Sequence, residues 1–215
     1  MHKYNRAIIA HIGPMWGGKT SAMRSDLRKM QIAKYETCLF KPFKDDRYAM
    51  SSVVTHDGDS MEAINVNTFQ DIVNYVEQNN HIKVIGIDEF QFIKLDKFNC
   101  TNISNCIYTI KDFIEWIIKN KYTLIISGLD LSSEFEPFEN IKELLPYATH
   151  IEKHKAVCVD CGNDATMSYC FVTKQDKELI GGEESYKPLC LNCYLEKRKE
   201  DEECRVNYTQ HTHQI

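Results

Sequence analysis

The stretch Gly13-Pro14-Met15-Trp16-Gly17-Gly18-Lys19-Thr20 decides the fold prediction, because it matches the phosphate-loop pattern G-x-x-x-x-G-K-[ST] at every specified position. Residues 6–12 before it form a short apolar run of buried-strand type, and residues 21–33 after it place apolar side chains at helical spacing. In a strand–loop–helix unit the glycines let backbone N–H groups surround a polyphosphate, while Lys19 reaches the outer phosphates and Thr20 offers a hydroxyl to Mg²⁺. We therefore expect all eight residues, Gly13, Pro14, Met15, Trp16, Gly17, Gly18, Lys19 and Thr20, to form a nucleoside triphosphate site.

Outward from this loop, strand and helix patterns alternate along the chain. Apolar strands are predicted at 37–41, 84–87 and 123–128, and helices at 68–77, 107–119 and 138–145. Alternation of this kind is typical of a parallel sheet with right-handed crossovers. The predicted fold class is α/β, a RecA-like phosphate-loop sheet with flanking helices over residues 1–150.

Composition narrows the functional classes. The chain has 215 residues and a net charge of −5, so no broad basic face is available for nucleic acid or an anionic membrane. No apolar run approaches the roughly 20 residues that span a bilayer, and the first residues lack the apolar stretch of a signal peptide. Nine cysteines without a secretory signal indicate reduced thiols or metal ligands. We expect a soluble, cytoplasmic protein with no nucleic-acid or membrane partner.

Two carboxylates follow the apolar strand at 84–87. A strand of this type ends beside the phosphate loop in a parallel sheet, so Asp88 is suited to hold Mg²⁺ and Glu89 to act as a base. The pair does not decide what Glu89 deprotonates. A water molecule would make the protein an ATPase, and a substrate hydroxyl would make it a kinase.

Four cysteines form two C-x-x-C pairs that are separated by 28 residues. Such a doubled pair supplies four thiolates at tetrahedral geometry, the pattern of a structural Zn²⁺ ribbon. We expect residues 151–195 to form a zinc-binding lid whose long loop lies over the active site, and the charged residues 196–215 to be disordered. The predicted zinc ligands are Cys158, Cys161, Cys190 and Cys193.

The ordered set of motifs resembles the zinc-containing, type II thymidine kinases. The resemblance runs from about residue 8 to residue 194. It is carried by the phosphate loop, Lys44-Asp45-Asp46-Arg47-Tyr48, Thr55-His56-Asp57, Ile87-Asp88-Glu89-Phe90-Gln91-Phe92, Gly128-Leu129-Asp130, Pro137-Phe138, the doubled cysteine pairs and Gly181-Gly182 with Tyr186.

The resemblance implies transfer of the γ-phosphate of ATP to the 5′-hydroxyl of thymidine or deoxyuridine, with Glu89 as the general base. It adds Asp45, Asp46, Arg47 and Gln91 to the ATP site, with Lys19 and Arg47 neutralising charge during transfer and Thr20 and Asp88 holding Mg²⁺. It also implies a homotetramer and feedback inhibition by thymidine triphosphate. The implied nucleoside-binding residues are Met15, Phe92, Leu129, Ser133, Phe138, Ser168, Lys177, Glu178, Leu179, Ile180, Gly181 and Tyr186.

Two positions depart from the family pattern. Ser133 stands where the family places a Phe, with Phe135 two residues further on, so either Phe135 replaces it or one aromatic wall is missing. Ser168 stands where the family often has a Thr beside the 5-methyl group of the base. The loss of a methyl group there would admit bulkier 5-substituents at a cost of about 1 kcal/mol in discrimination.

Two other functions would use the same motifs. A zinc-ribbon NTPase would hydrolyse ATP without a nucleoside acceptor and act on nucleic acid, which the acidic charge balance disfavours. A non-catalytic nucleotide-binding regulator would have no need of the complete set Lys19, Asp88 and Glu89. A nucleoside kinase is the function that we expect.

Overall fold

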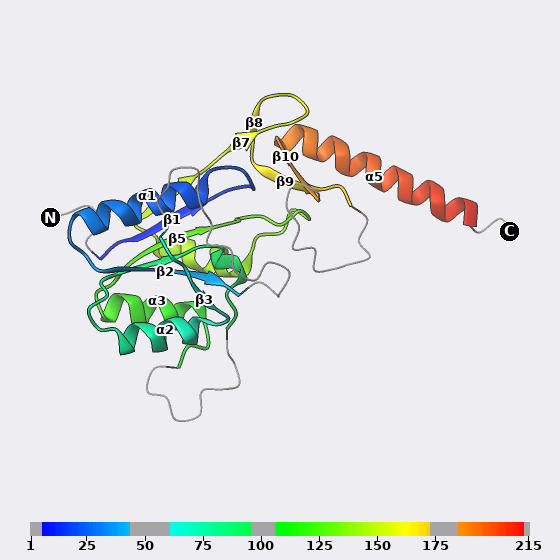
Figure 1. Ribbon diagram of the computed structural model, residues 1–215. Helices are drawn as coiled ribbons and strands as arrows, with labels where there is room; N and C mark the ends of the chain where they lie inside the picture. The colour runs from blue at the N-terminus through cyan, green and yellow to red at the C-terminus, as the bar shows by residue number, and fades with distance from the viewer. Residues whose placement is uncertain (1–5, 44–60, 96–105, 173–184, 213–215) are drawn as a thin grey trace. The chain divides into compact units, whose positions relative to one another are not determined.

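A computed structural model describes residues 6–43, 61–95, 106–172 and 185–212, with the backbone alone over 203–212 (Figure 1). The chain divides into two compact units. The first unit comprises Met1–Ile12, Lys19–Asp130 and Pro137–Lys153. The second unit comprises Gly13–Gly18, Leu131–Glu136 and His154–Ile215.

The first unit is built on a six-stranded sheet whose strand pairs are all parallel, in the order β3-β2-β4-β5-β1-β6. This arrangement confirms the predicted α/β class. Two strands, β3 and β6, were not expected from the sequence, because β3 has only three residues and all four residues of β6 are exposed at the sheet edge. The strands are β1 (Ile8–Ile12), β2 (Thr37–Pro42), β3 (Ile64–Val66), β4 (Val84–Ile87), β5 (Thr123–Gly128) and β6 (His150–Lys153).

Helices cover both faces of this sheet. Met23, Leu27 and Met30 of α1 pack with Ile9 of β1 on one face, while α2, α3 and α4 pack on the other. Figure 1 shows α1 on one side of the strands and α2 with α3 on the opposite side. The helices of the first unit are α1 (Lys19–Ile32), α2 (Phe69–Gln78), α3 (Ile110–Lys119) and α4 (Glu139–Leu144), with short 3-10 helices η2 (Phe90–Phe92) and η3 (Leu145–Tyr147).

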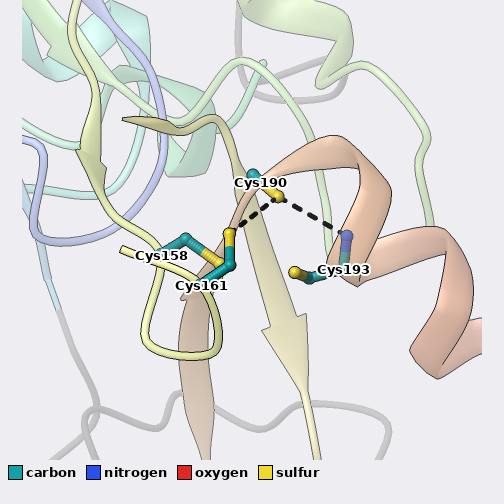
Figure 2. Close-up of side chains that lie close together, drawn as sticks. All are labelled: Cys158, Cys161, Cys190 and Cys193. Atoms are coloured by element: carbon teal, nitrogen blue, oxygen red, sulfur yellow. Dashed lines mark hydrogen bonds between the residues drawn. The ribbon is translucent and has the colours of Figure 1, made fainter. Parts of the chain in front are cut away.

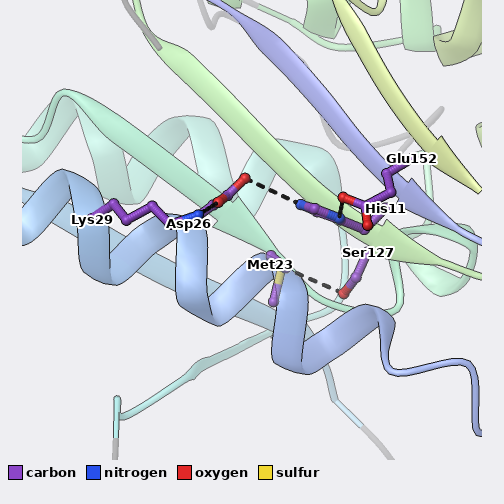
Figure 3. A network of polar contacts seen from close by, with 6 residues as sticks. All are labelled: His11, Met23, Asp26, Lys29, Ser127 and Glu152. Atoms are coloured by element: carbon purple, nitrogen blue, oxygen red, sulfur yellow. Dashed lines mark hydrogen bonds and ion pairs between the residues drawn. The ribbon is translucent and has the colours of Figure 1, made fainter. Parts of the chain in front are cut away.

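A buried histidine lies on β1, the strand next to the edge strand β6. His11 of β1 is 2% exposed, and its ring nitrogens lie 3.5 Å from Asp26 Oδ2 of α1 and 3.5 Å from Glu152 Oε2 of β6 (Figure 3). Asp26 also forms an ion pair with Lys29 at 2.6 Å. Carboxylates on two sides offer the imidazole polar partners within an otherwise apolar strand, which the hydrophobic pattern alone did not reveal.

The second unit has short antiparallel pairs and one long helix. Its elements are β7 (Ala156–Val157), β8 (Asp164–Ala165), β9 (Met167–Cys170), β10 (Tyr186–Leu189) and α5 (Leu191–Thr212). β7 pairs with β8, and β9 pairs with β10. A small core made of Ala156, Ala165, Met167, Leu189 and Tyr194 holds them together.

The end of the chain differs from the expectation of disorder at residues 196–215, since α5 continues to Thr212. Residues 195–200 of α5 are strong helix formers, and opposite charges lie one turn apart. Lys197 pairs with Glu200 at 2.8 Å, and Arg198 lies 4.0 Å from Glu202. Pairs at these spacings stabilise a helix whose surface is polar all round. None of the helices in the described part of the chain combines the length and apolar character needed to cross a bilayer.

Candidate active site

The carboxylates expected to carry the chemistry stand at the C-terminal end of β4. All four residues of β4 are buried, and Asp88 and Glu89 are the first half-buried residues after it. Glu89 has a left-handed backbone, with φ 52° and ψ 44°. A non-glycine residue adopts this conformation only where its surroundings enforce it, and such strain concentrates at functional sites.

Gln91 holds the Glu89 side chain in place. Gln91 Nε2 donates to Glu89 Oε2 at 2.6 Å, and the backbone N–H of Leu129 donates to Gln91 Oε1 at 3.1 Å. A Cβ at Gly128 would lie 2.6 Å from Gln91 Oε1, so only glycine leaves room for this amide. The end of β5 therefore fixes Gln91, and Gln91 fixes Glu89.

Asp88 is linked to two neighbouring hydroxyl groups. Thr20 Oγ1 donates to Asp88 Oδ1 at 3.0 Å, and Ser127 Oγ donates to the same oxygen. The backbone N–H of Glu89 also donates to Asp88 Oδ1, at 3.1 Å. The first turn of α1 and the ends of β4 and β5 thus meet at one carboxylate. Ser127 was not predicted, because its only signal in the sequence was its place near the end of an apolar strand.

Lys19 is the first residue of α1 and is only 9% exposed. Burial lowers the pKa of its ammonium group, against the opposing effect of the Glu89, Asp88 and Asp130 carboxylates. The ammonium group is already largely removed from water and lies near three carboxylates. It is therefore suited to bind an incoming anion. Asp130 was not predicted at this site, although it lies two residues after the end of β5. Asp130 also forms an ion pair with Lys153 at 2.8 Å.

Two aromatic residues of the predicted nucleoside site are in contact. The rings of Phe92 and Phe138 pack edge-to-face with centroids 5.8 Å apart. Asn140, which sequence reasoning did not single out, donates from Nδ2 to the carbonyl of Ile93 at 2.8 Å and to that of Phe90 at 3.3 Å. Asn140 therefore supports the short helix η2 that carries Gln91 and Phe92.

The glycine-rich part of the phosphate loop lies in the second unit. Gly13 has φ 138°, and a Cβ there would lie 2.4 Å from the carbonyl oxygen of His154, so no other residue fits. Gly18 has φ 79°, and the Gly17 N–H donates to the Pro14 carbonyl at 3.3 Å. Trp16, with φ 61°, is 40% exposed. Gly13 and Gly18 both have positive φ angles, a conformation that favours glycine. This fits the expectation that the glycines let the backbone of the loop bend around a phosphate.

Four residues of the predicted nucleoside site belong to the second unit. The backbone N–H of Met15 donates to Ser168 Oγ at 3.0 Å, and Ser168 is buried on β9. Ser133 is half-buried, and its carbonyl accepts a hydrogen bond from Tyr194 at 2.9 Å. Tyr186 begins β10, where burial first and Cys170 second raise the pKa of its phenol. Ser168 therefore contacts the phosphate loop, a role its sequence position did not suggest.

The four predicted zinc ligands come together. Their sulfur atoms all lie within 4.8 Å of one another, and Cys161 Sγ is 3.6 Å from Cys190 Sγ (Figure 2). Four thiolates bound to Zn²⁺ at about 2.3 Å in a tetrahedron have sulfur atoms about 3.8 Å apart. Burial alone would raise the pKa of Cys158, but the N–H groups of Cys190, Cys161 and Asp160 outweigh it and bring the pKa to about 6. Size and chemistry both fit a closed Cys₄ metal site.

Part of the predicted site lies outside the described residues. This applies to three residues of the expected ATP site and to five of the expected nucleoside-binding loop. They are Asp45, Asp46, Arg47, Lys177, Glu178, Leu179, Ile180 and Gly181.

Comparison with known proteins places the chain in a family. A family model described as thymidine kinase matches residues 6–194. The chain is 34% identical to the thymidine kinase of Sheeppox virus over 184 residues, 86% of this chain and 94% of the relative. It is 34% identical to the thymidine kinase of Myxoma virus strain Lausanne over 195 residues, 91% of this chain and 99% of the relative. The bacterial thymidine kinase of Pseudothermotoga lettingae is 32% identical over 184 residues, 85% of this chain and 91% of the relative.

The matches extend across both units and include the phosphate loop, the carboxylates after β4 and the cysteine cluster. Such a family membership implies an ATP-dependent nucleoside kinase, a transferase rather than a hydrolase. The chain belongs to the thymidine kinase family.

Proposed function

We propose that this chain transfers the γ-phosphoryl group of ATP to the 5′-hydroxyl of thymidine, and also accepts deoxyuridine, in pyrimidine deoxynucleotide salvage. The observation that carries this proposal is the Glu89 carboxylate, held by Gln91 at 2.6 Å and adjacent to an Asp88 that contacts Thr20 of the phosphate loop. A fixed base one residue from the expected metal ligand suits deprotonation of a bound hydroxyl.

In the proposed reaction Glu89 accepts the proton of the 5′-hydroxyl. The 5′-oxygen forms a bond to the γ-phosphorus, while the bond from that phosphorus to the β–γ bridging oxygen breaks. ADP leaves with the bridging electron pair, and the products are dTMP, ADP and a proton that Glu89 later releases. Gln91 supports this role because its amide orients one carboxylate oxygen of Glu89.

We assign to Lys19 the stabilisation of negative charge on the phosphates during transfer. Its ammonium group is already buried beside Asp88, Glu89 and Asp130, so an incoming triphosphate would meet a partly desolvated cation. Electrostatic stabilisation is stronger in such a setting than in bulk water. Arg47, which is not among the described residues, would neutralise charge together with Lys19.

Thr20 and Asp88 would hold the Mg²⁺ that accompanies ATP. A hydroxyl and a carboxylate 3.0 Å apart offer the hard oxygen ligands that this ion prefers. When bound, the ion supplies positive charge to the β- and γ-phosphate oxygens. The four cysteines would hold one structural Zn²⁺, whose role is to fix the short strands of the second unit.

The nucleoside site is proposed from the residues that match the family pattern. We propose residues 1–150 as the nucleotide-binding domain and 151–195 as a zinc-binding lid that excludes water from the reaction. We also propose a cytoplasmic homotetramer that thymidine triphosphate inhibits. The proposed nucleoside contacts within the described chain are Met15, Phe92, Leu129, Ser133, Phe138, Ser168 and Tyr186.

A coupled ADP-release assay with and without nucleoside tests the proposal. We expect ADP release to depend on thymidine or deoxyuridine, with the nucleoside monophosphate formed in equal amount to ADP. Hydrolysis of ATP that is independent of any nucleoside would instead identify a zinc-ribbon NTPase. A panel of thymidine analogues with larger 5-substituents then tests whether Ser133 and Ser168 widen the pocket.

A further inference from the structure

The first turns of α5 bind the backbone of residues Leu131–Glu136, another segment of the second unit. Tyr194 is fully buried, and its hydroxyl donates to the Ser133 carbonyl at 2.9 Å. One turn later, Arg198 Nη1 donates to the Glu134 carbonyl at 3.0 Å and lies 3.3 Å from the Tyr194 hydroxyl. Two consecutive carbonyl groups of one segment are thus held by two side chains of one helix.

The bound segment has a strained turn. Phe135 has a left-handed backbone with φ 70°, which is unfavourable for an aromatic residue. Its ring stacks on that of Tyr194, with centroids 5.9 Å apart and planes inclined by 25°. Within the segment, Ser132 Oγ accepts from the N–H groups of Glu134 and Glu136, both at 3.2 Å. Such a conformation persists where surrounding contacts determine it, and Tyr194 provides two of them.

These contacts also account for the position of Phe135. The sequence left open whether this ring replaces the missing aromatic side chain at position 133. Its contact is with Tyr194 of α5, so the ring serves to anchor the segment. A serine side chain at 133 is too small to fix the segment by packing, and its carbonyl is held by Tyr194 instead.

We propose that Tyr194 and Arg198 are positioning residues that fix Leu131–Glu136, and through it Ser133, for binding the nucleoside. This inference rests on the proposed function, because it takes Ser133 as part of the nucleoside site. Neither side chain reacts with substrate. They keep one short segment in a single conformation before the nucleoside arrives, which lowers the entropy lost on binding.

The substitution Tyr194→Phe tests the proposal, because it removes one hydroxyl and keeps the ring that stacks on Phe135. The variant loses the hydrogen bond to the Ser133 carbonyl and the one from Arg198 Nη1. We expect the KM for thymidine to rise by up to about fivefold, the factor for one ordinary hydrogen bond to the segment, with kcat, the KM for ATP and the zinc content unchanged. Arg198→Met, which keeps the aliphatic part of the side chain, should also raise the KM for thymidine.

Tyr169→Phe is the matched control. The Tyr169 hydroxyl donates to Asp201 of α5 at 2.9 Å, and its ring packs edge-to-face on Tyr194, so both of these contacts are with α5 and not with Leu131–Glu136. This variant should keep the wild-type KM for thymidine. The proposal would be overturned if Tyr194→Phe and Tyr169→Phe had the same KM for thymidine. It would also be overturned if Tyr194→Phe raised the KM for ATP as much as the KM for thymidine.

Amide hydrogen exchange gives a readout that does not depend on activity. We expect faster exchange within residues 131–136 in Tyr194→Phe than in Tyr169→Phe or wild type, because the segment loses an anchor. Unchanged exchange would refute the proposed anchoring. If wild-type protein released no ADP in response to thymidine, the proposed function would fail, whereas the exchange result would still decide the role of Tyr194.

Discussion

Gln91 donates its side-chain amide to Glu89 at 2.6 Å and accepts the Leu129 N–H at 3.1 Å, so the proposed base is fixed by the neighbouring strand. Glu89 does not rely on a flexible side chain alone, since its backbone is also held in a left-handed conformation. Orientation of a base before the substrate binds is a direct contribution to catalysis.

Replacing the base should separate binding from chemistry. We expect Glu89→Gln to lower kcat by about 10²–10⁴-fold, the range for loss of a positioned general base, while the affinity for ATP is kept. Single-turnover measurements of dTMP formation give the first quantity, and calorimetric titration with ATP gives the second. Near-normal turnover would show that another group accepts the proton.

Gly128→Ala should displace Gln91. The new Cβ would lie 2.6 Å from Gln91 Oε1 and 3.0 Å from Ile141 Cδ1, both at the far ends of flexible side chains. We expect only a small loss in the free energy of unfolding, because these ends can shift, but a lower kcat, because the displaced Gln91 no longer orients Glu89. Urea unfolding and steady-state kinetics measure both effects.

Gly162→Ala is the control for that variant. Gly162 has φ 76°, so alanine is strained there too, but its Cβ would meet no atom within 4 Å. Stability should fall modestly and kcat should stay at the wild-type value. A kcat for Gly128→Ala as high as that of this control would contradict the proposed role of Gln91.

Lys19→Met should stabilise the protein near neutral pH while it abolishes phosphoryl transfer. Burial lowers the pKa of Lys19 in the folded state and outweighs the attraction of Glu89, Asp88 and Asp130. Below that lowered pKa, the lysine is charged in both folded and unfolded states, so the full cost of burying its charge opposes folding. The methionine variant avoids this cost.

The stability difference should depend on pH in a defined direction. As pH rises from the lowered pKa of Lys19 towards the ordinary value of 10.5, the folded protein loses the proton first. The unfolded state then binds more protons, so wild-type stability increases relative to Lys19→Met and the gap narrows. Urea unfolding of both proteins across this range measures the gap; a gap that widened with pH would contradict the assignment.

Zinc removal should act through the cysteine cluster. We expect about one Zn²⁺ per chain by elemental analysis, lost in Cys161→Ser because four thiolates complete the site. Melting temperature and activity should fall with the metal. Cys170→Ser is the control, since Cys170 lies on β9 outside the cluster and its thiol donates to the Val172 carbonyl, with sulfur and oxygen 3.9 Å apart. Full zinc content in Cys161→Ser would contradict the Cys₄ assignment.

Much of this architecture follows from local sequence signals. The phosphate loop and the buried strands at β1, β4 and β5 were predictable because their patterns are short-range and strongly apolar. The exposed edge strand β6 was not predictable, because it is defined by its pairing with β1 and has no apolar pattern. Capping boxes at Thr68 and Thr109 set the starts of α2 and α3 within a few residues of the predicted ones.

The site was harder to predict where it depends on tertiary contacts. Glu89 and Asp88 were identifiable because they directly follow an apolar strand. The hydrogen bonds from Ser127 to Asp88 and from Asn140 to Phe90 were not predictable. Each joins residues about 40 to 50 positions apart, and neither Ser127 nor Asn140 belongs to a motif. The helical end of the chain was also missed, since charge composition indicates disorder while the spacing of the charges favours a helix.

The second unit draws its residues from three separate stretches of chain, Gly13–Gly18, Leu131–Glu136 and His154–Ile215. This limits how the gene can be recombined. A chimaera that exchanged only the cysteine-containing end between two relatives would join a foreign Ser168 to a resident Met15, and a foreign Tyr194 to a resident Ser133. The three stretches are therefore expected to be exchangeable only together, as a single heritable block despite their distance in sequence.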